Sequence, residues 1–114
     1  MPGRGGTWQE KVLHVFHGNG VDGYNPYSPL IFGRAGNLYG TTYSGGAYGY
    51  GTVFRLVLGS TGKWTETILH SFQHNGTDAV QPFAGLTLGV SGLLYGTGAY
   101  GGDYLEGAVF EITP

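Results

Sequence analysis

The sequence predicts an all-β fold made of two copies of one unit, and three observations support this prediction. Glycine supplies 24 of the 114 residues, about three times its usual share. Short runs that alternate apolar and polar residues end at glycine-rich turns, and no stretch shows the 3.6-residue period of an amphipathic helix. The chain also repeats itself at an offset of 56 positions without a gap.

The internal repeat defines the domain organisation. Between residues 8 and 56, 22 of the 49 residues are identical to the residue 56 positions later. TWQEKVLHVF aligns with KWTETILHSF, and GNLYGTTYSGG aligns with GLLYGTGAYGG. We therefore assign 8–63 to repeat 1 and 64–114 to repeat 2, and expect residues 1–7 to form a flexible N-terminal tail.

Four short strands are predicted in each repeat. In repeat 1 the first spans 8–16, and a loop rich in Gly, Asn, Asp and Pro separates it from a second strand near 29–33. The turn RAGN leads to the third strand, 38–44, and the glycine-rich GGAYGYG leads to the fourth, 52–58. By the two-residue period of a strand, one face of the first strand carries Trp8, Glu10, Val12, His14 and Phe16.

Composition excludes several classes of protein. Five basic and seven acidic residues give a net charge of −2, which provides no basic surface for nucleic acid or an anionic membrane. Cysteine is absent, so the chain has neither disulfides nor a thiolate metal site. No apolar run approaches the ~18 residues of a membrane span, and MPGRGGTWQE lacks the apolar core of a signal peptide.

Four antiparallel strands repeated at this spacing are typical of a β-propeller blade. The stretch from SPLIFGRAGNLYGTTYSGG to KWTETILHSF resembles a kelch blade. More specifically, LHxF, NGxD, GNLYGTTYSGG and GTVF resemble the GloVer repeat, found in tandem in bacterial proteins with varied cell-surface anchors. The resemblance covers residues 8–112 and implies a propeller and an extracellular or cell-surface setting; it implies no established chemistry.

Two blades are too few for a closed propeller, which needs about four to eight. The blade of repeat 1 is expected to be completed by the strand at 64–72, whereas that of repeat 2 lacks such a strand after 107–113. We expect the strand at 8–16 of a neighbouring molecule to complete it, in a cyclic homo-oligomer closed by strand exchange. A trimer with six blades is preferred to a tetramer with eight. The expected closure residues are Trp8, Glu10, Val12, His14, Phe16, Val109 and Phe110.

The rival fold is a monomeric β-sandwich or barrel with internal pseudo-twofold symmetry. A chain of 114 residues would suit such a domain. The phase of the repeat favours the propeller, because the sequence opens with the Trp-bearing strand, which is outermost in a kelch-type blade.

Tyrosines and one amide are the candidate ligand-binding residues. A tyrosine ring offers an apolar face and a hydroxyl at low entropy cost, which suits sugars. Tyr43, Tyr50 and Tyr100 differ between the repeats, and Tyr24 and Asn25 lie before the inner strand. The sequence therefore predicts a non-catalytic, self-assembling module for a small polar ligand such as a carbohydrate. The alternative is a purely structural or surface scaffold, and an enzyme is the third candidate.

Titratable residues give no catalytic cluster by spacing. Glu10 and His14, like Glu66 and His70 in repeat 2, lie four apart on one strand face, so the Cα atoms of each pair are about 13 Å apart, too far for an acid–base pair. Their polar ends are expected to bond to a neighbouring blade. Asn19 and Asp22 in NGVD recur as NGTD, and a tight turn is favoured over a calcium site because no third carboxylate is nearby. No metal site, catalytic residue or cofactor is predicted.

Overall fold

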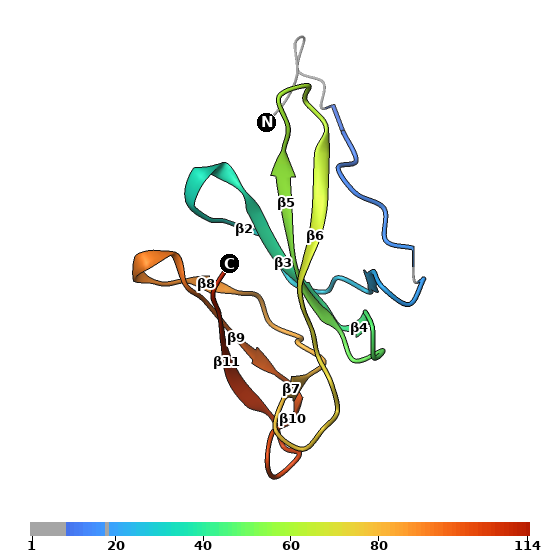
Figure 1. Cartoon of the computed structure of the whole chain (residues 1–114), viewed down its shortest axis with the longest axis vertical. Coiled ribbons are helices and arrows are strands. Elements are labelled where there is room, and N and C mark those ends of the chain that lie inside the picture. The colour runs from blue at the N-terminus through green and yellow to red at the C-terminus, as the bar shows by residue number, and fades with distance from the viewer. Residues whose placement is uncertain (1–8, 18) are drawn as a thin grey trace.

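The computed structural model describes residues 9–17 and 19–114, and its regular structure consists of short antiparallel strands and two 3-10 turns (Figure 1). The tail at 1–7 and the predicted closure residue Trp8 lie outside the described residues. The prediction of an all-β fold with antiparallel sheets is confirmed, and none of the sheets closes on itself. Among the described residues no helix is long and apolar enough to cross a membrane.

The larger sheet has four strands in the order β2-β3-β5-β6. Repeat 1 supplies β2 (Ile31–Phe32), β3 (Leu38–Thr42) and β5 (Thr52–Leu58), and the turn at Arg34–Gly36 joins β2 to β3. The outer strand, β6 (Trp64–Ser71), comes from repeat 2. The expected pairing of the fourth strand of repeat 1 with the Trp-bearing strand of repeat 2 is therefore present.

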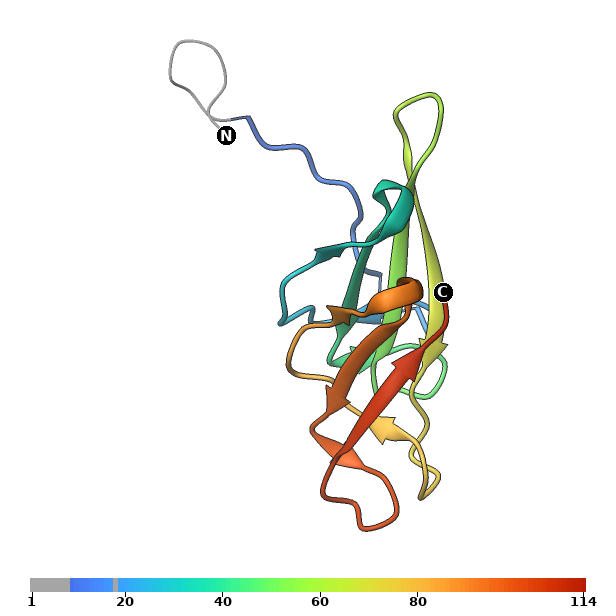
Figure 2. The same cartoon turned by 90° about the vertical axis from the view of Figure 1, so that its left-hand side faces the viewer.

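The smaller sheet has three strands, all from repeat 2, in the order β8-β9-β11 (Figure 2). They are β8 (Thr87–Leu88), β9 (Leu94–Gly98) and β11 (Ala108–Ile112). The turn at Val90–Gly92 joins β8 to β9, as the turn at Arg34–Gly36 joins β2 to β3. In the smaller sheet, β11 occupies the position that β5 has in the larger sheet. Unlike β5, it pairs with a strand on one side only and so forms an edge.

Two further ribbons, each of two strands, were not predicted. Strand β1 (Gly23–Tyr24) pairs with β4 (Ser44–Gly45), and β7 (Ala79–Val80) pairs with β10 (Tyr100–Gly101). The predicted strand at 38–44 is therefore divided into β3 and β4. Gly45 and Gly101 have φ of +82° and +84°, a left-handed conformation that favours glycine, which explains why glycine occurs at this site in both repeats.

The prediction of a strand at 8–16 is wrong for the single chain. Residues 9–17 have no strand structure and pair with no strand among the described residues; the edge strand β11 is on the other side of the molecule (Figure 1). The segment packs instead on the larger sheet, where Leu13 and Phe16 contact a buried cluster. That cluster consists of Leu38, Phe54 and Leu56.

Apolar side chains lie on both faces of the larger sheet, as the two-residue period of a strand requires. The outer face carries the cluster beneath residues 9–17. The other face contributes to a core shared with the smaller sheet, in which Val53, Phe72 and Leu94 have 0% exposure. The remaining members of this core are Tyr39, Ala79, Val80 and Leu86.

A β-bulge in β6 corrects the prediction that its Glu and His share one face. Glu66 lies opposite Leu56, on the outer face, whereas His70 lies opposite Val53, which faces the smaller sheet. The register shifts between Val53 and Phe54, so one extra residue of β6 is inserted and the alternation reverses. Glu66 and His70 therefore point toward different neighbours.

Candidate functional site

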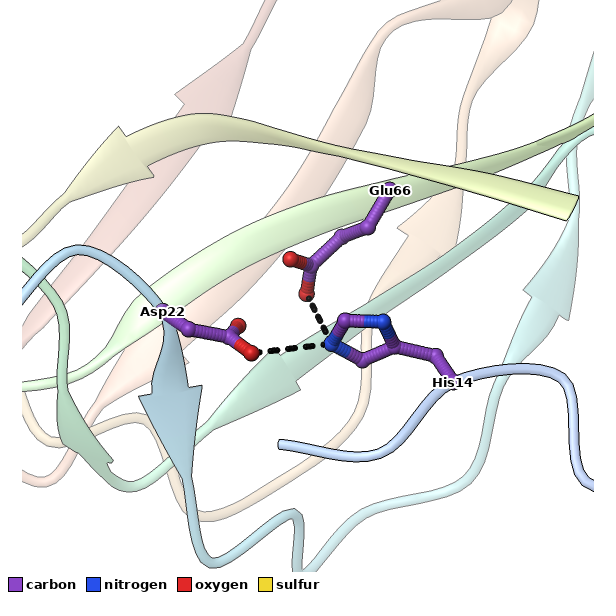
Figure 3. A group of neighbouring side chains, drawn as sticks. All are labelled: His14, Asp22 and Glu66. Carbon is purple, nitrogen blue, oxygen red and sulfur yellow. Dashed lines mark hydrogen bonds and ion pairs between the residues drawn. The ribbon is translucent and has the colours of Figure 1, made fainter. Parts of the chain in front are cut away.

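Three polar side chains from three separate segments meet on the outer face of the larger sheet (Figure 3). The Nε2 atom of His14 lies 2.9 Å from Oδ2 of Asp22 and 3.1 Å from Oε2 of Glu66. The side chains are largely buried, with exposed fractions of 19% for His14, 7% for Asp22 and 12% for Glu66. We call this group the carboxylate–histidine cluster.

Local turn chemistry positions Asp22. The Oδ1 atom of Asn19 accepts hydrogen bonds from the backbone N–H groups of Val21, at 3.1 Å, and Asp22, at 2.9 Å, so the predicted tight turn in NGVD is confirmed. The backbone N–H of His17 donates to Oδ2 of Asp22 at 3.2 Å. The turn thus holds the carboxylate against residues 14–17.

Aromatic packing positions His14, and strand pairing positions Glu66. The His14 ring meets the edge of Phe16 at 4.7 Å, and the Phe16 ring contacts Phe54 at 5.3 Å. Glu66 is held in β6 opposite Leu56. The cluster therefore joins repeat 1 to the first strand of repeat 2.

Burial and a second carboxylate raise the pKa of Glu66 from 4.5 to about 8. The main cause is the loss of water around the charged form, followed by a hydrogen bond to Asp22 and repulsion by its charge. Two carboxylates face one imidazole nitrogen, and the proximity of Asp22 favours the protonated form of Glu66.

The cluster offers one nitrogen and two oxygen atoms within 4.8 Å of one another. These are ligand types that a divalent cation such as Zn²⁺ accepts. His14 and Asp22 share a hydrogen bond of 2.9 Å, whereas the 3.1 Å contact between His14 and Glu66 is a close polar contact that leaves Oε2 of Glu66 without a hydrogen-bond partner. The group is therefore a buried polar link between three segments.

Repeat 2 contains two of the three members of the cluster. The Nε2 atom of His70 lies 2.9 Å from Oδ2 of Asp78, and the backbone N–H of Gln73 donates to the same oxygen at 2.9 Å. Asn75 forms the same turn as its counterpart in repeat 1. The side chains of His70 and Asp78 are more exposed, at 37% and 19%. Beside them lies an open groove of about 750 Å³.

The sequence predicts that the polar end of Glu66 bonds to a neighbouring blade, and in the structure it lies 3.1 Å from Nε2 of His14 in the same chain. The sequence did not predict Asp22 in the same group, because Asp22 was assigned only to a turn. One feature of the sequence could have revealed the cluster: each of its three residues is identical in both repeats. The equivalents of His14, Asp22 and Glu66 are His70, Asp78 and Glu10.

Three of the predicted ligand-binding residues lie close together. The backbone N–H of Tyr43 donates to the carbonyl of Asn25 at 3.0 Å, and Tyr24 pairs with the residue after Tyr43 in the ribbon of β1 and β4. The Tyr43 ring contacts Tyr27 and Phe83 at 5.5 and 5.7 Å. These two rings are 59% and 61% exposed and were not among the predicted site residues.

The other two predicted tyrosines lie in two other segments of the chain. Tyr50 is stacked on His74 with ring centroids 5.3 Å apart, and Tyr100 pairs with Val80 in the ribbon of β7 and β10. Both rings are exposed, at 36% and 52%. The five predicted residues are therefore not brought together in one site by any contact that involves Tyr50 or Tyr100.

The predicted closure residues divide into exposed and packed members. Val12 and Val109 are 64% and 78% exposed, and Glu10 is also exposed. Phe110 packs within the chain on Phe72, with ring centroids 5.0 Å apart. His14 and Phe16, as described above, pack on the larger sheet.

The comparisons with known proteins give one match. A family model described as the Gloeobacter/Verrucomicrobia repeat matches residues 3–114. No curated protein and no solved structure matches the chain.

Proposed function

The chain belongs to the Gloeobacter/Verrucomicrobia repeat family, and from that premise we propose that it is a self-assembling β-propeller module whose first partner is another copy of itself. Its two sheets are taken as neighbouring blades of a ring. The chain supplies a complete four-stranded blade and an incomplete one of three strands. A second copy supplies the missing strand.

The unequal sheets carry this proposal. Repeat 1 obtains its outer strand, β6, from the next repeat along the chain, whereas repeat 2 leaves β11 as an edge. An edge strand exposes a row of unpaired backbone N–H and C=O groups that favours pairing with another chain. Residues 9–17, which are equivalent in sequence to the region of β6, have no strand partner in their own chain.

Ring closure limits the number of copies. Each chain contributes two blades, and closed propellers contain about four to eight. A trimer with six blades is the preferred assembly, and a tetramer with eight is the alternative. Head-to-tail contacts of this kind generate rings when the rotation closes.

A crystal structure of the assembled protein tests this architecture. We expect a ring in which residues 9–15 of each chain form the outer strand on β11 of the next. A structure in which β11 remains an edge, or in which 9–17 has no strand partner, would overturn the proposal.

A small polar ligand, most simply a carbohydrate, is the second part of the proposed function. The aromatic cluster of the exposed Tyr27 and Phe83 and the half-buried Tyr43 supports it, because such rings stack against the C–H faces of sugars. Binding to a glycan array that is lost in Tyr43→Ala, with the native mass unchanged, is expected. An array without binding would contradict this part and favour the scaffold alternative, in which the module has no small ligand.

A further inference from the structure

The two repeats reproduce one another's contacts around the carboxylate–histidine cluster. The His–Asp distance is 2.9 Å in both, and the His ring meets the neighbouring Phe ring at 4.7 Å in repeat 1 and 4.8 Å in repeat 2. Phe16 contacts Phe54 at 5.3 Å, and Phe72 contacts Phe110 at 5.0 Å. Residues 9–17 therefore lie on the larger sheet much as the end of β6 lies on the smaller one.

One contact is missing from repeat 2. Glu66 completes the cluster in repeat 1, and no glutamate or second aspartate within the described residues joins His70 and Asp78 in the same way. Its counterpart 56 positions earlier is Glu10, which is exposed and has no hydrogen bond or ion pair within the described residues. The site at His70 and Asp78 therefore lacks a glutamate. Glu10, the sequence equivalent of Glu66, lies away from that site in the single chain.

We propose that Glu10 of a second copy of this chain completes the His70–Asp78 site. The inference rests on the self-assembly proposed above and adds the residue and the register by which it occurs. Glu66 reaches the cluster in repeat 1 because β6 pairs with β5. Glu10 would reach His70 in the same way, with residues 9–15 of the second copy paired to β11.

The pairing of β5 with β6 fixes the register of this interface. Leu56 lies opposite Glu66, Arg55 opposite Thr67 and Phe54 opposite Ile68. Moving each pair by one repeat places Ile112 opposite Glu10, Glu111 opposite Lys11 and Phe110 opposite Val12 of the second copy.

Charge and hydrophobicity agree with this register. Glu111 and Lys11 have opposite charges, and opposite charges across a strand pair are favourable. Val12, 64% exposed in the single chain, would pack on the partly buried Phe110, as Ile68 packs on the cluster that includes Phe54. The groove beside His70 and Asp78 leaves room for the incoming carboxylate.

Residues 9–17 can contact β11 of a second copy and the larger sheet of their own chain at the same time. Strand β6 contacts two sheets in this way. Within the chain, β6 pairs with β5 and also directs His70 and the following Phe72 toward the smaller sheet. In the ring, residues 9–15 would pair with β11 of a second copy while His14 and Phe16 stay on their own sheet. The contacts of His14 and Phe16 within the chain would be kept.

Histidine NMR on the full-length assembly tests the role of Glu10. The chain has four histidines, whose imidazole signals can be assigned by single His→Gln substitutions. Glu10→Gln is expected to shift the signal of His70 and leave that of His14 unchanged. The matched control, Glu66→Gln, is expected to shift His14 and leave His70 unchanged.

Cysteine cross-linking tests the register without altering Glu10. The chain has no cysteine, so a disulfide forms only between introduced residues. The control Arg55→Cys with Thr67→Cys is expected to close within the chain, because these residues are opposed in β5 and β6. Lys11→Cys with Glu111→Cys, the equivalent pair, is expected to give disulfide-linked multimers.

The outcomes separate this inference from the proposed function. A native mass of one chain would refute self-assembly and this inference together. A multimer in which Glu10→Gln leaves the His70 signal in place would refute the role of Glu10 alone. A multimer in which the control pair closes but the equivalent pair gives no interchain disulfide would refute the register.

Discussion

Replacing Val12 with Asp tests the proposed interface without disturbing the single chain. Val12 is 64% exposed, so in the single chain an aspartate there remains in water. In the assembly, Val12 occupies the position of Ile68, which packs on a buried cluster. The substitution should therefore weaken association and leave the fold of each chain intact.

The expected size of the effect follows from this exposure. Full burial of a valine side chain is worth about 1.5–3 kcal/mol, and about two thirds of it remains to be gained at Val12, or ~1–2 kcal/mol per interface. Aspartate loses this gain and adds a carboxylate desolvation cost of several kcal/mol. Since ~1.4 kcal/mol is a factor of ten, the dissociation constant per interface should rise about tenfold from the apolar loss and more than about 1,000-fold in total.

Light scattering over a dilution series measures this change, and circular dichroism checks that the strands persist. Val90→Asp is the matched control, because Val90 is 87% exposed and lies in the turn between β8 and β9, away from the proposed interface. Val90→Asp should assemble like the unaltered chain. If Val12→Asp assembled equally well, residues 9–15 would not form the interface.

Two further predictions concern stability. In the folded chain Glu66 keeps its proton up to about pH 8, whereas the unfolded chain releases it near 4.5; this stabilisation is therefore complete below pH 4.5 and is lost as the pH rises toward 8. Gln has no such proton to lose, so in Glu66→Gln the free energy of unfolding measured in urea should fall less between pH 4.5 and about 8. An unchanged dependence on pH would contradict the raised pKa of Glu66. Phe72→Ala, at a site with 0% exposure, should lower the free energy of unfolding by about 3–5 kcal/mol. Phe32→Ala, at a site 68% exposed, should cost less than ~1 kcal/mol, and equal losses in urea unfolding would contradict the position of the core.

The sequence allowed the longer strands to be predicted, because their alternation of apolar and polar residues is local. Thr52–Leu58 has the predicted bounds, and the strand predicted at 64–72 ends one residue earlier, as Trp64–Ser71. The two ribbons were missed because each of their strands has only two residues, too few to show a period. Residues 9–17 form no strand in the single chain because strand structure depends on a pairing partner as well as on pattern.

The candidate site was harder to predict because it depends on contacts between residues far apart in the sequence. Asp22 and Glu66 belong to different repeats, and only the packing of residues 14–17 on the larger sheet brings them to one imidazole. The bulge in β6 also reverses the face on which His70 lies, and no local pattern reveals that reversal. The repeat itself was the usable signal, since it marks His14, Asp22 and Glu66 as identical pairs.

The native mass of the unaltered chain in solution tests the central claim, that the molecule is completed by copies of itself. One chain has a mass of 12.1 kDa, so three chains give about 36 kDa and four give about 48 kDa. We predict the mass of the trimer, with that of the tetramer as the alternative. A folded species at 12.1 kDa throughout the concentration range would contradict the claim.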